Sequence, residues 1–178
     1  MDSIPHPAAS LPESLRFQYV AVLVAVVYAD GSADVREISL VRRLCDALDL
    51  APSARETIEA ATRAPNPIMV KQTVRLLGAI GDKLRFALMT DAIAFSFVDG
   101  RVTSSEITQL WSFADSLEIS RDSVLALARW VEGVLVESPD GAPRLSRALE
   151  SGLDGLPLDP STAAAAVRWL DETLRRTT

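Results

Sequence analysis

The sequence predicts an all-α fold built from two copies of one helical unit. Apolar residues recur at helical spacings of 3 and 4, and no stretch alternates at period two for long enough to form a strand. The chain has 178 residues, of which 48% are hydrophobic and 24% charged, so it can bury a core without disulfide or metal support. Its two halves also repeat each other. We expect one helical bundle of about eight or nine helices.

The internal repeat appears when the sequence is compared with itself at an offset of 69 residues, from position 15 to position 84. No gap is needed over about forty residues, which is the signature of a duplicated structural unit. The identical pairs are Leu15/Leu84, Arg16/Arg85, Phe17/Phe86, Ala25/Ala94, Asp30/Asp99, Gly31/Gly100, Glu37/Glu106, Ile38/Ile107, Asp46/Asp115 and Leu48/Leu117. We predict two stacked copies, repeat one at about 15–64 and repeat two at about 84–137.

Each repeat is predicted to be a helical hairpin followed by a third helix. The first helices, at about 13–29 and 82–98, are apolar nearly all round, so we expect them at the centre of the domain. The second helices begin at Asp34 and Thr103, which are N-cap residue types. Glu37 and Glu106 follow three positions later, at the spacing of a capping box.

The hairpin geometry also predicts two ion pairs. Both hairpins contain an Asp-Gly pair where the chain is expected to turn. If the two helices of each hairpin then run antiparallel, Arg16 lies beside the region of Asp46, and Arg85 lies beside the region of Asp115. An aspartate near a helix C-terminus is disfavoured by the helix dipole, so an arginine partner is expected there.

The two ends of the chain differ from the repeats. Residues 1–12 hold three prolines and few large apolar groups, so we predict a flexible N-terminal tail before a single all-helical domain at 13–178. C-terminal helices are expected within 142–176. The run of small residues at 162–166 suits close packing against another helix or against a second subunit in a homodimer.

Charge and hydropathy exclude several classes of protein. There are 18 Lys and Arg against 24 Asp and Glu, a net charge of -6, which disfavours nucleic-acid binding. The longest apolar run, 19–29, is shorter than the ~20 residues that span a bilayer, and no basic cluster precedes it. We therefore expect a cytoplasmic protein without direct membrane insertion.

The residues of catalytic chemistry are scarce. Cys45 lies on an apolar helical stripe and aligns with Ala114, which favours a buried, inert thiol. His6, the one histidine, lies in the proline-rich tail, and neither a nucleophile motif nor a phosphate-binding loop is present. We expect no enzymatic activity, no catalytic residues and no organic cofactor.

The candidate functional residues lie in the motif Asp-Gly-x5-Glu, which occurs at 30–37 and again at 99–106. The spacing is that of the fifth, sixth and twelfth positions of an EF-hand loop. The first and third positions of such a loop carry oxygen ligands. Here they are aliphatic or aromatic in both copies: Val26, Tyr28, Phe95 and Phe97. Neither copy is therefore an EF-hand.

Two interpretations of the acidic motif remain. Stacked repeats could pool five carboxylates into a site for Ca²⁺ or Mg²⁺, namely Asp30, Asp34, Glu37, Asp99 and Glu106. Both glutamates end an apolar stripe, where a carboxylate needs a partner. Alternatively, helix capping and turn chemistry explain the same residues, and the protein is a structural interaction module without a metal site.

These motifs resemble those of the tellurite-resistance TerB-like family. The resemblance rests on Ala29-Asp30-Gly31 with Glu37, and on 98–103 with Glu106 and 117–120, and it covers about 15–135. The chain is also similar to the N-terminal domain of the membrane-tethered co-chaperone DjlA. Copy one departs from the family pattern at 32–34, where Ser-Ala-Asp replaces an apolar residue followed by Ser or Thr.

The resemblance implies an all-helical domain with two related halves. It further implies a cytoplasmic, non-catalytic role in stress response, with metal binding and contacts to membrane-associated protein partners. The acidic positions of the family correspond to Asp30, Glu37, Asp99 and Glu106.

Overall fold

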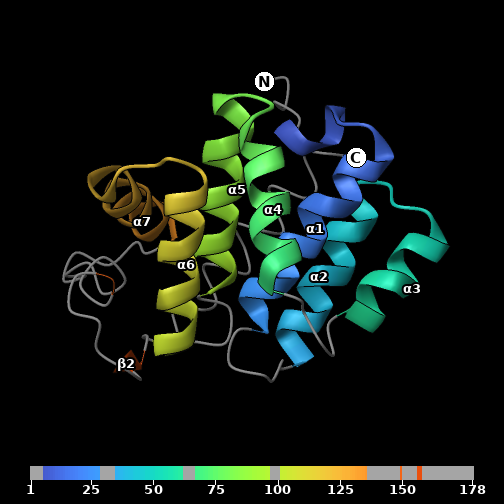
Figure 1. Cartoon of the computed structure of the whole chain (residues 1–178). Helices are drawn as coiled ribbons and strands as arrows, with labels where there is room; N and C mark the ends of the chain where they lie inside the picture. Colours follow the sequence, from blue (N-terminus) through green and yellow to red (C-terminus); the bar gives the residue numbers. More distant parts are fainter. Residues whose placement is uncertain are drawn as a thin grey trace.

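The computed structural model describes residues 6–28, 35–61, 67–96, 101–135, 149 and 156–157. Within these residues the chain forms seven α-helices, one 3₁₀ helix and one pair of two-residue strands (Figure 1). The elements are η1 (Pro7–Ser10), α1 (Glu13–Val27), α2 (Val35–Ala47), α3 (Pro52–Ala61), α4 (Pro67–Gly78), α5 (Asp82–Phe95), β1 (Arg101–Val102), α6 (Ser104–Ser116), α7 (Arg121–Leu135) and β2 (Leu156–Pro157).

The predicted all-α class is confirmed. The one departure from helix in the described residues is the antiparallel pairing of β1 with β2, in which Arg101 lies opposite Pro157 and Val102 opposite Leu156. The C-terminal helices expected within 142–176 lie outside the described residues, apart from 149 and 156–157. The expected helix count of the whole chain is therefore not comparable with the seven described.

The centre of the domain is formed by α1 and α5. Helix α1 packs against α2, α3, α4, α5 and α6, and α5 packs against α1, α4, α6 and α7 (Figure 1). Both helices are apolar on almost every face, so neither can be stable on the surface of the protein. The central placement predicted from their sequences is thus observed.

The two repeats keep the same local architecture. Helices α2 and α3 pack on α1 as α6 and α7 pack on α5. Helices α2 and α6 also end alike, because Asp49 and Glu118 adopt positive φ values of 48° and 55°. The following amides donate back into the last turn, from Leu50 N to Cys45 O at 3.0 Å and from Ile119 N to Ala114 O at 2.9 Å. Both ends are Schellman motifs, related by the same offset as the sequence repeat.

Helix α4 joins the two halves, since it packs against α1, α5 and α6. The approach to repeat two is close at Gly78. A Cβ atom on Gly78 would lie 2.9 Å from Cδ2 of Leu117, a buried side chain at the end of α6. Glycine at this position therefore permits the observed distance between α4 and α6.

The predicted flexible tail is folded over the part that the structure describes. His6 is the N-cap of η1, Pro7 occupies its first position, and the side chains of His6 and Ala8 are buried against the core. Residues 6–12 therefore correct the prediction, because burial and hydrogen bonding of His6 outweigh the low apolar content of the segment. Residues 1–5 lie outside the described residues.

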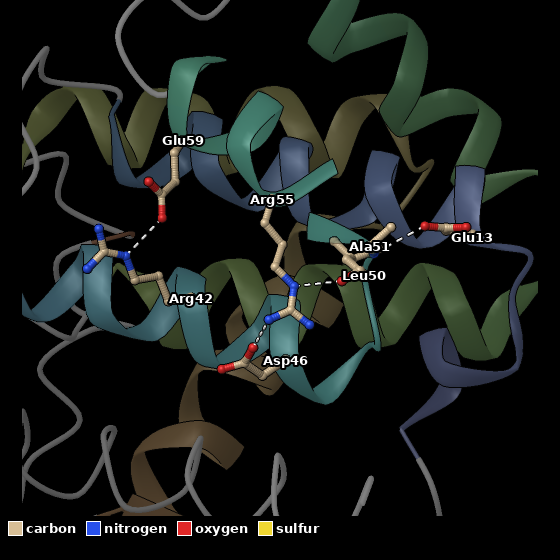
Figure 2. Close-up of polar contacts among 7 residues, drawn as sticks. All are labelled: Glu13, Arg42, Asp46, Leu50, Ala51, Arg55 and Glu59. Carbon is tan, nitrogen blue, oxygen red and sulfur yellow. Dashed lines mark hydrogen bonds and ion pairs between the residues drawn. The ribbon is translucent and has the colours of Figure 1, made fainter. Parts of the chain in front are cut away.

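The predicted ion pairs Arg16–Asp46 and Arg85–Asp115 are not formed in the described structure, although Arg85 and Asp115 line the same cavity. Asp46 and Arg85 have other partners, and the buried Nε of Arg16 has no hydrogen-bond partner among the described residues. Asp46 pairs with Arg55, which also donates from Nε to the Leu50 carbonyl at 2.6 Å (Figure 2). Arg85 bonds Asp82, three residues earlier on α5, at 2.8 Å. Asp46 and Arg85 each bind a partner that is close in the sequence. An exposed ion pair contributes only ~0–1 kcal/mol, which is too little to hold a more distant side chain in place.

Figure 2 shows the whole corner between α1, α2 and α3. The Ala51 amide donates to Glu13 at 3.2 Å, and Arg42 Nε donates to Glu59 at 2.9 Å. Together with Arg55, these contacts tie the loop after α2 to its neighbouring helices.

Candidate functional site

The structure describes two of the five predicted site residues. Glu37 lies in the first turn of α2 and Glu106 in the first turn of α6, and both are buried, at 5% and 4% exposure. Asp30, Asp34 and Asp99 lie outside the described residues. Whether the two acidic turns approach each other therefore stays a prediction.

Glu106 forms the capping box that the sequence predicts. Its backbone N–H donates to Thr103 Oγ1 at 3.2 Å, and its Oε2 accepts from the Thr103 amide at 2.6 Å and from the Thr103 hydroxyl at 3.0 Å. These bonds satisfy donors that a helix start leaves open, and the carboxylate also complements the positive end of the helix dipole. Burial of this charge is thereby explained.

A divalent cation would need more oxygen ligands than the described carboxylates offer. Ca²⁺ takes about six to eight oxygens, and Mg²⁺ about six. The described part of the chain holds no group of three or more His, Cys, Asp or Glu side chains that could bind a metal ion. One Glu106 oxygen already accepts two hydrogen bonds. Glu37 and Glu106 alone therefore do not fit a cation, and such a site would depend on Asp30, Asp34 and Asp99.

A buried polar cluster that sequence reasoning missed lies elsewhere in the core. Oδ2 of Asp91, on α5, accepts hydrogen bonds from the Tyr19 hydroxyl at 2.7 Å and from His6 Nε2 at 2.9 Å. The His6 and Tyr19 rings also pack edge to face, with centroids 5.6 Å apart. All three side chains are buried, so this cluster joins η1, α1 and α5 in the interior.

Protonation of the cluster follows from its geometry. His6 Nδ1 accepts from the Ala8 amide at 3.1 Å, so the neutral ring carries its proton on Nε2, facing Asp91. Burial by itself lowers the pKa of His6, but the Asp91 charge and hydrogen bond outweigh it, and the pKa is raised from its usual value. The Ala8 amide opposes a second proton on the ring and so limits this rise.

Tyr19 stays protonated far into the alkaline range. Burial, the Asp91 charge and the hydrogen bond to Asp91 all raise its pKa well above the usual value. With two donors on one carboxylate oxygen and all three side chains buried, the cluster stabilises the packing of η1, α1 and α5.

One sequence signal could have revealed the cluster. Asp91 interrupts a helix that is otherwise apolar nearly all round, and a carboxylate in such a position requires donors. The sequence does not show which donors reach it, because Tyr19 and His6 are 72 and 85 residues away.

Cys45 is buried in the core, as expected. Burial raises the pKa of its thiol to about 11, although the nearby Arg55 charge opposes the rise. The thiolate is therefore scarce at neutral pH, which agrees with an inert thiol.

The fold and its capped, repeated hairpins define a two-repeat helical domain. No helix in the described residues is both long and apolar enough to cross a membrane. A family model described as "Tellurite resistance protein TerB" matches residues 6–60, which run from the N-cap of η1 into α3. The chain is TerB-like over this stretch, and the predicted resemblance is confirmed there. No curated protein and no solved structure matches the chain. The similarity to DjlA stays a prediction.

Proposed function

We propose that the protein is a non-enzymatic, TerB-like helical adaptor of stress response that acts in the cytoplasm by binding other proteins, membrane-associated ones included. The match to TerB over residues 6–60 supports the family and the all-helical fold supports a scaffold. The burial of the His6–Tyr19–Asp91 cluster supports a structural role for these residues.

Exposed apolar side chains carry the adaptor proposal. Leu76 on α4, Ile80 in the following turn and Phe86 on α5 are 50%, 44% and 38% exposed. These residues lie in or beside the connection between α4 and α5 in the sequence, and exposed apolar groups that form a patch are typical of protein contact regions. They are the apolar surface that a partner would cover.

The adaptor function is tested by crosslinking the full chain to its partners in cells with and without tellurite. The triple variant Leu76→Ser, Ile80→Ser, Phe86→Ser is compared with Val35→Ser, which changes an apolar residue that is 83% exposed on α2. We expect specific crosslinks and tellurite tolerance to be lost in the triple variant and kept in Val35→Ser. Equal crosslinks and tolerance in all variants would contradict the proposal.

A second candidate function is the binding of Ca²⁺ or Mg²⁺ by Asp30, Asp34, Glu37, Asp99 and Glu106. The observation that favours it is the burial of both described glutamates, which are the last residues of the two acidic motifs. The competing interpretation is a purely structural module, or a homo-oligomeric scaffold, in which these residues only cap helices. The capping box of Glu106 supports the competing interpretation.

Thermal unfolding separates these two interpretations when glutamine replaces glutamate. In Glu37→Gln, Glu106→Gln, the side-chain oxygen needed for a capping box remains and the charge needed by a cation is lost. If a cation binds, a concentration of ~100 Kd stabilises the wild type by ~2.7 kcal/mol and not the variant. If the residues only cap helices, chelator and added Ca²⁺ or Mg²⁺ leave both melting temperatures unchanged. Thr103→Ala then still costs ~1 kcal/mol.

A further inference from the structure

The corner at the turn after the second helix of each repeat differs between the two repeats in one side chain, which is charged in repeat one and apolar in repeat two. In repeat one, the guanidinium of Arg55 lies against Asp46 and the Leu50 carbonyl (Figure 2). It thereby pairs with a carboxylate in the last turn of α2 and donates to a carbonyl in the turn that follows, close to the negative end of the helix dipole. The guanidinium of Arg55 is therefore a structural element of repeat one.

Repeat two keeps the backbone of this corner and loses the cation. The position equivalent to Arg55 is Val124, which is fully buried in the core. The hydrogen bonds of the turn are repeated, including Val124 N to Ser120 O at 3.0 Å, where repeat one has Arg55 N to Ala51 O at 3.1 Å. Asp115 and Glu118 are exposed, and within the described part of the chain no cation pairs with them.

A cavity of about 500 Å³ lies beside Asp115 and Glu118, the two carboxylates of this turn. Arg75 and Gly78 of α4 and Arg85 of α5 line it, and the end of α6 contributes Asp115, Ser116 and Glu118. Cations thus come from α4 and α5, and carboxylates from α6 and the turn that follows it. No ion pair among the described residues joins the two groups across the cavity.

The arginines of the cavity have unused hydrogen-bonding capacity. Arg85 donates from Nη2 to Asp82, but its buried Nε has no acceptor. Arg75 forms no ion pair in the described structure. A purely basic ligand would leave the arginines without a partner, and a purely acidic ligand would leave the carboxylates without one. The lining is therefore complementary to a segment that carries both a positive and a negative side chain.

We propose that this cavity docks a polypeptide segment of the adaptor's partner, with a basic side chain set against Asp115 and Glu118 and an adjacent acidic side chain toward Arg75 and Arg85. The basic group pairs with Asp115 as Arg55 pairs with the equivalent Asp46 in repeat one. The volume lies within the range of sites for small ligands and accommodates a few side chains of a partner. This inference rests on the proposed adaptor function and describes the chemistry of its partner.

The test is an NMR titration of the ¹⁵N-labelled full chain with the dipeptide Ac-Glu-Arg-NH₂. We expect shifts of the Gly78, Ser116 and Glu118 amides and millimolar binding. Ac-Gln-Arg-NH₂ and Ac-Glu-Gln-NH₂ should bind about fivefold more weakly, because each loses one charged contact. Asp115→Asn, Glu118→Gln should weaken Ac-Glu-Arg-NH₂ by a similar factor. Asp46→Asn, Asp49→Asn changes the equivalent residues of repeat one and should leave binding unchanged.

Three results would overturn the inference: no shifts at these amides at about a hundredfold molar excess, equal binding by the Asp115/Glu118 variant, or equal binding by all three dipeptides. The adaptor function has a separate outcome. If Asp115→Asn, Glu118→Gln weakens dipeptide binding as expected but leaves the cellular crosslinks intact, the cavity binds the dipeptide without contacting the partner, and the inference fails while the adaptor function stands.

Discussion

The carboxylate of Asp91 shows how one buried charge can determine the position of several elements. It receives hydrogen bonds from Tyr19 on α1 and from His6 at the start of η1, so α5 holds two segments from the beginning of the chain. A buried carboxylate with two donors is tolerated, whereas the same charge without them costs several kcal/mol. The cluster therefore specifies where the N-terminal segment packs.

Removing one partner of this cluster should be costly. Asp91→Ala leaves a buried hydroxyl and a buried imidazole without their acceptor, and we expect a loss of ~3 kcal/mol in the free energy of unfolding. Tyr19→Phe removes one donor and should cost ~1–2 kcal/mol. Urea unfolding measures both, and the double variant should cost less than their sum, because the lost contact is shared. Strict additivity would show that the hydrogen bond contributes nothing.

His6 should make stability depend on pH above the usual imidazole pKa of 6.5. Its pKa is raised in the folded protein, so above the usual value of 6.5 the folded state binds more protons than the unfolded state. The contribution of His6 is then fully present below pH 6.5 and is lost as the pH rises through the folded pKa. The urea midpoint should fall over this range in the wild type. In His6→Gln it should be nearly flat, because the chain has no other histidine; an equal fall would point to another group.

At the scale of single elements, α2 and α6 end with the same backbone conformation but with residues that differ in how well they tolerate it. Both place a residue in the left-handed region, Asp49 at φ 48° and Glu118 at φ 55°. Aspartate tolerates this region better than glutamate, because its short side chain can hydrogen-bond locally. The end of α6 therefore carries more backbone strain than the end of α2.

Glycine should relieve this strain at α6. Glu118→Gly removes a cost of ~1–2 kcal/mol in the folded state and adds ~0.5–1 kcal/mol of chain entropy, so we expect a net stabilisation of up to ~1 kcal/mol. Asp49→Gly should gain less. Differential scanning calorimetry would detect the rise in melting temperature. The matched control is Thr108→Gly on the exposed face of α6, which should destabilise by ~0.3–0.5 kcal/mol. Destabilisation by Glu118→Gly would contradict this account.

At the scale of the whole molecule, α4 determines how the two repeats meet. It is the helix between them in sequence, and it contacts α1 of repeat one as well as α5 and α6 of repeat two (Figure 1). Gly78 lets its last turn approach Leu117, and the same region forms one wall of the charged cavity. Stability and the proposed docking site therefore depend on the same contact.

A methyl group at this contact should separate the repeats slightly. Gly78→Ala places a Cβ atom within 2.9 Å of Leu117 Cδ2, and such overpacking typically costs ~1–3 kcal/mol. We expect a loss at the low end of this range in chemical denaturation, because alanine also favours the helix. In a Leu117→Ala background the added cost should fall below ~0.5 kcal/mol, since the clashing atom is absent. If Gly78→Ala destabilises the Leu117→Ala background as much as the wild type, the clash involves an atom other than Leu117 Cδ2.

Much of the fold could be predicted because local sequence encodes it. Helical periodicity placed α1 and α5 at the centre, and the Thr103–Glu106 spacing identified a capping box that the structure contains. The TerB-like resemblance was confirmed over residues 6–60. The pooled acidic site depends on the positions of Asp30, Asp34 and Asp99, which lie outside the described residues, so this part of the candidate site stays a prediction.

The sequence by itself determined the helical class, the duplication and the capping of α6, because each depends on residues within a few turns or on a fixed offset along the chain. Only the tertiary structure decided that His6 and Tyr19 meet Asp91, that Asp46 pairs with Arg55 and not with Arg16, and that basic and acidic side chains line one cavity beside α6. The physical reason is that partners of buried and surface charges are selected by which helices pack together. One-dimensional spacing does not specify that packing.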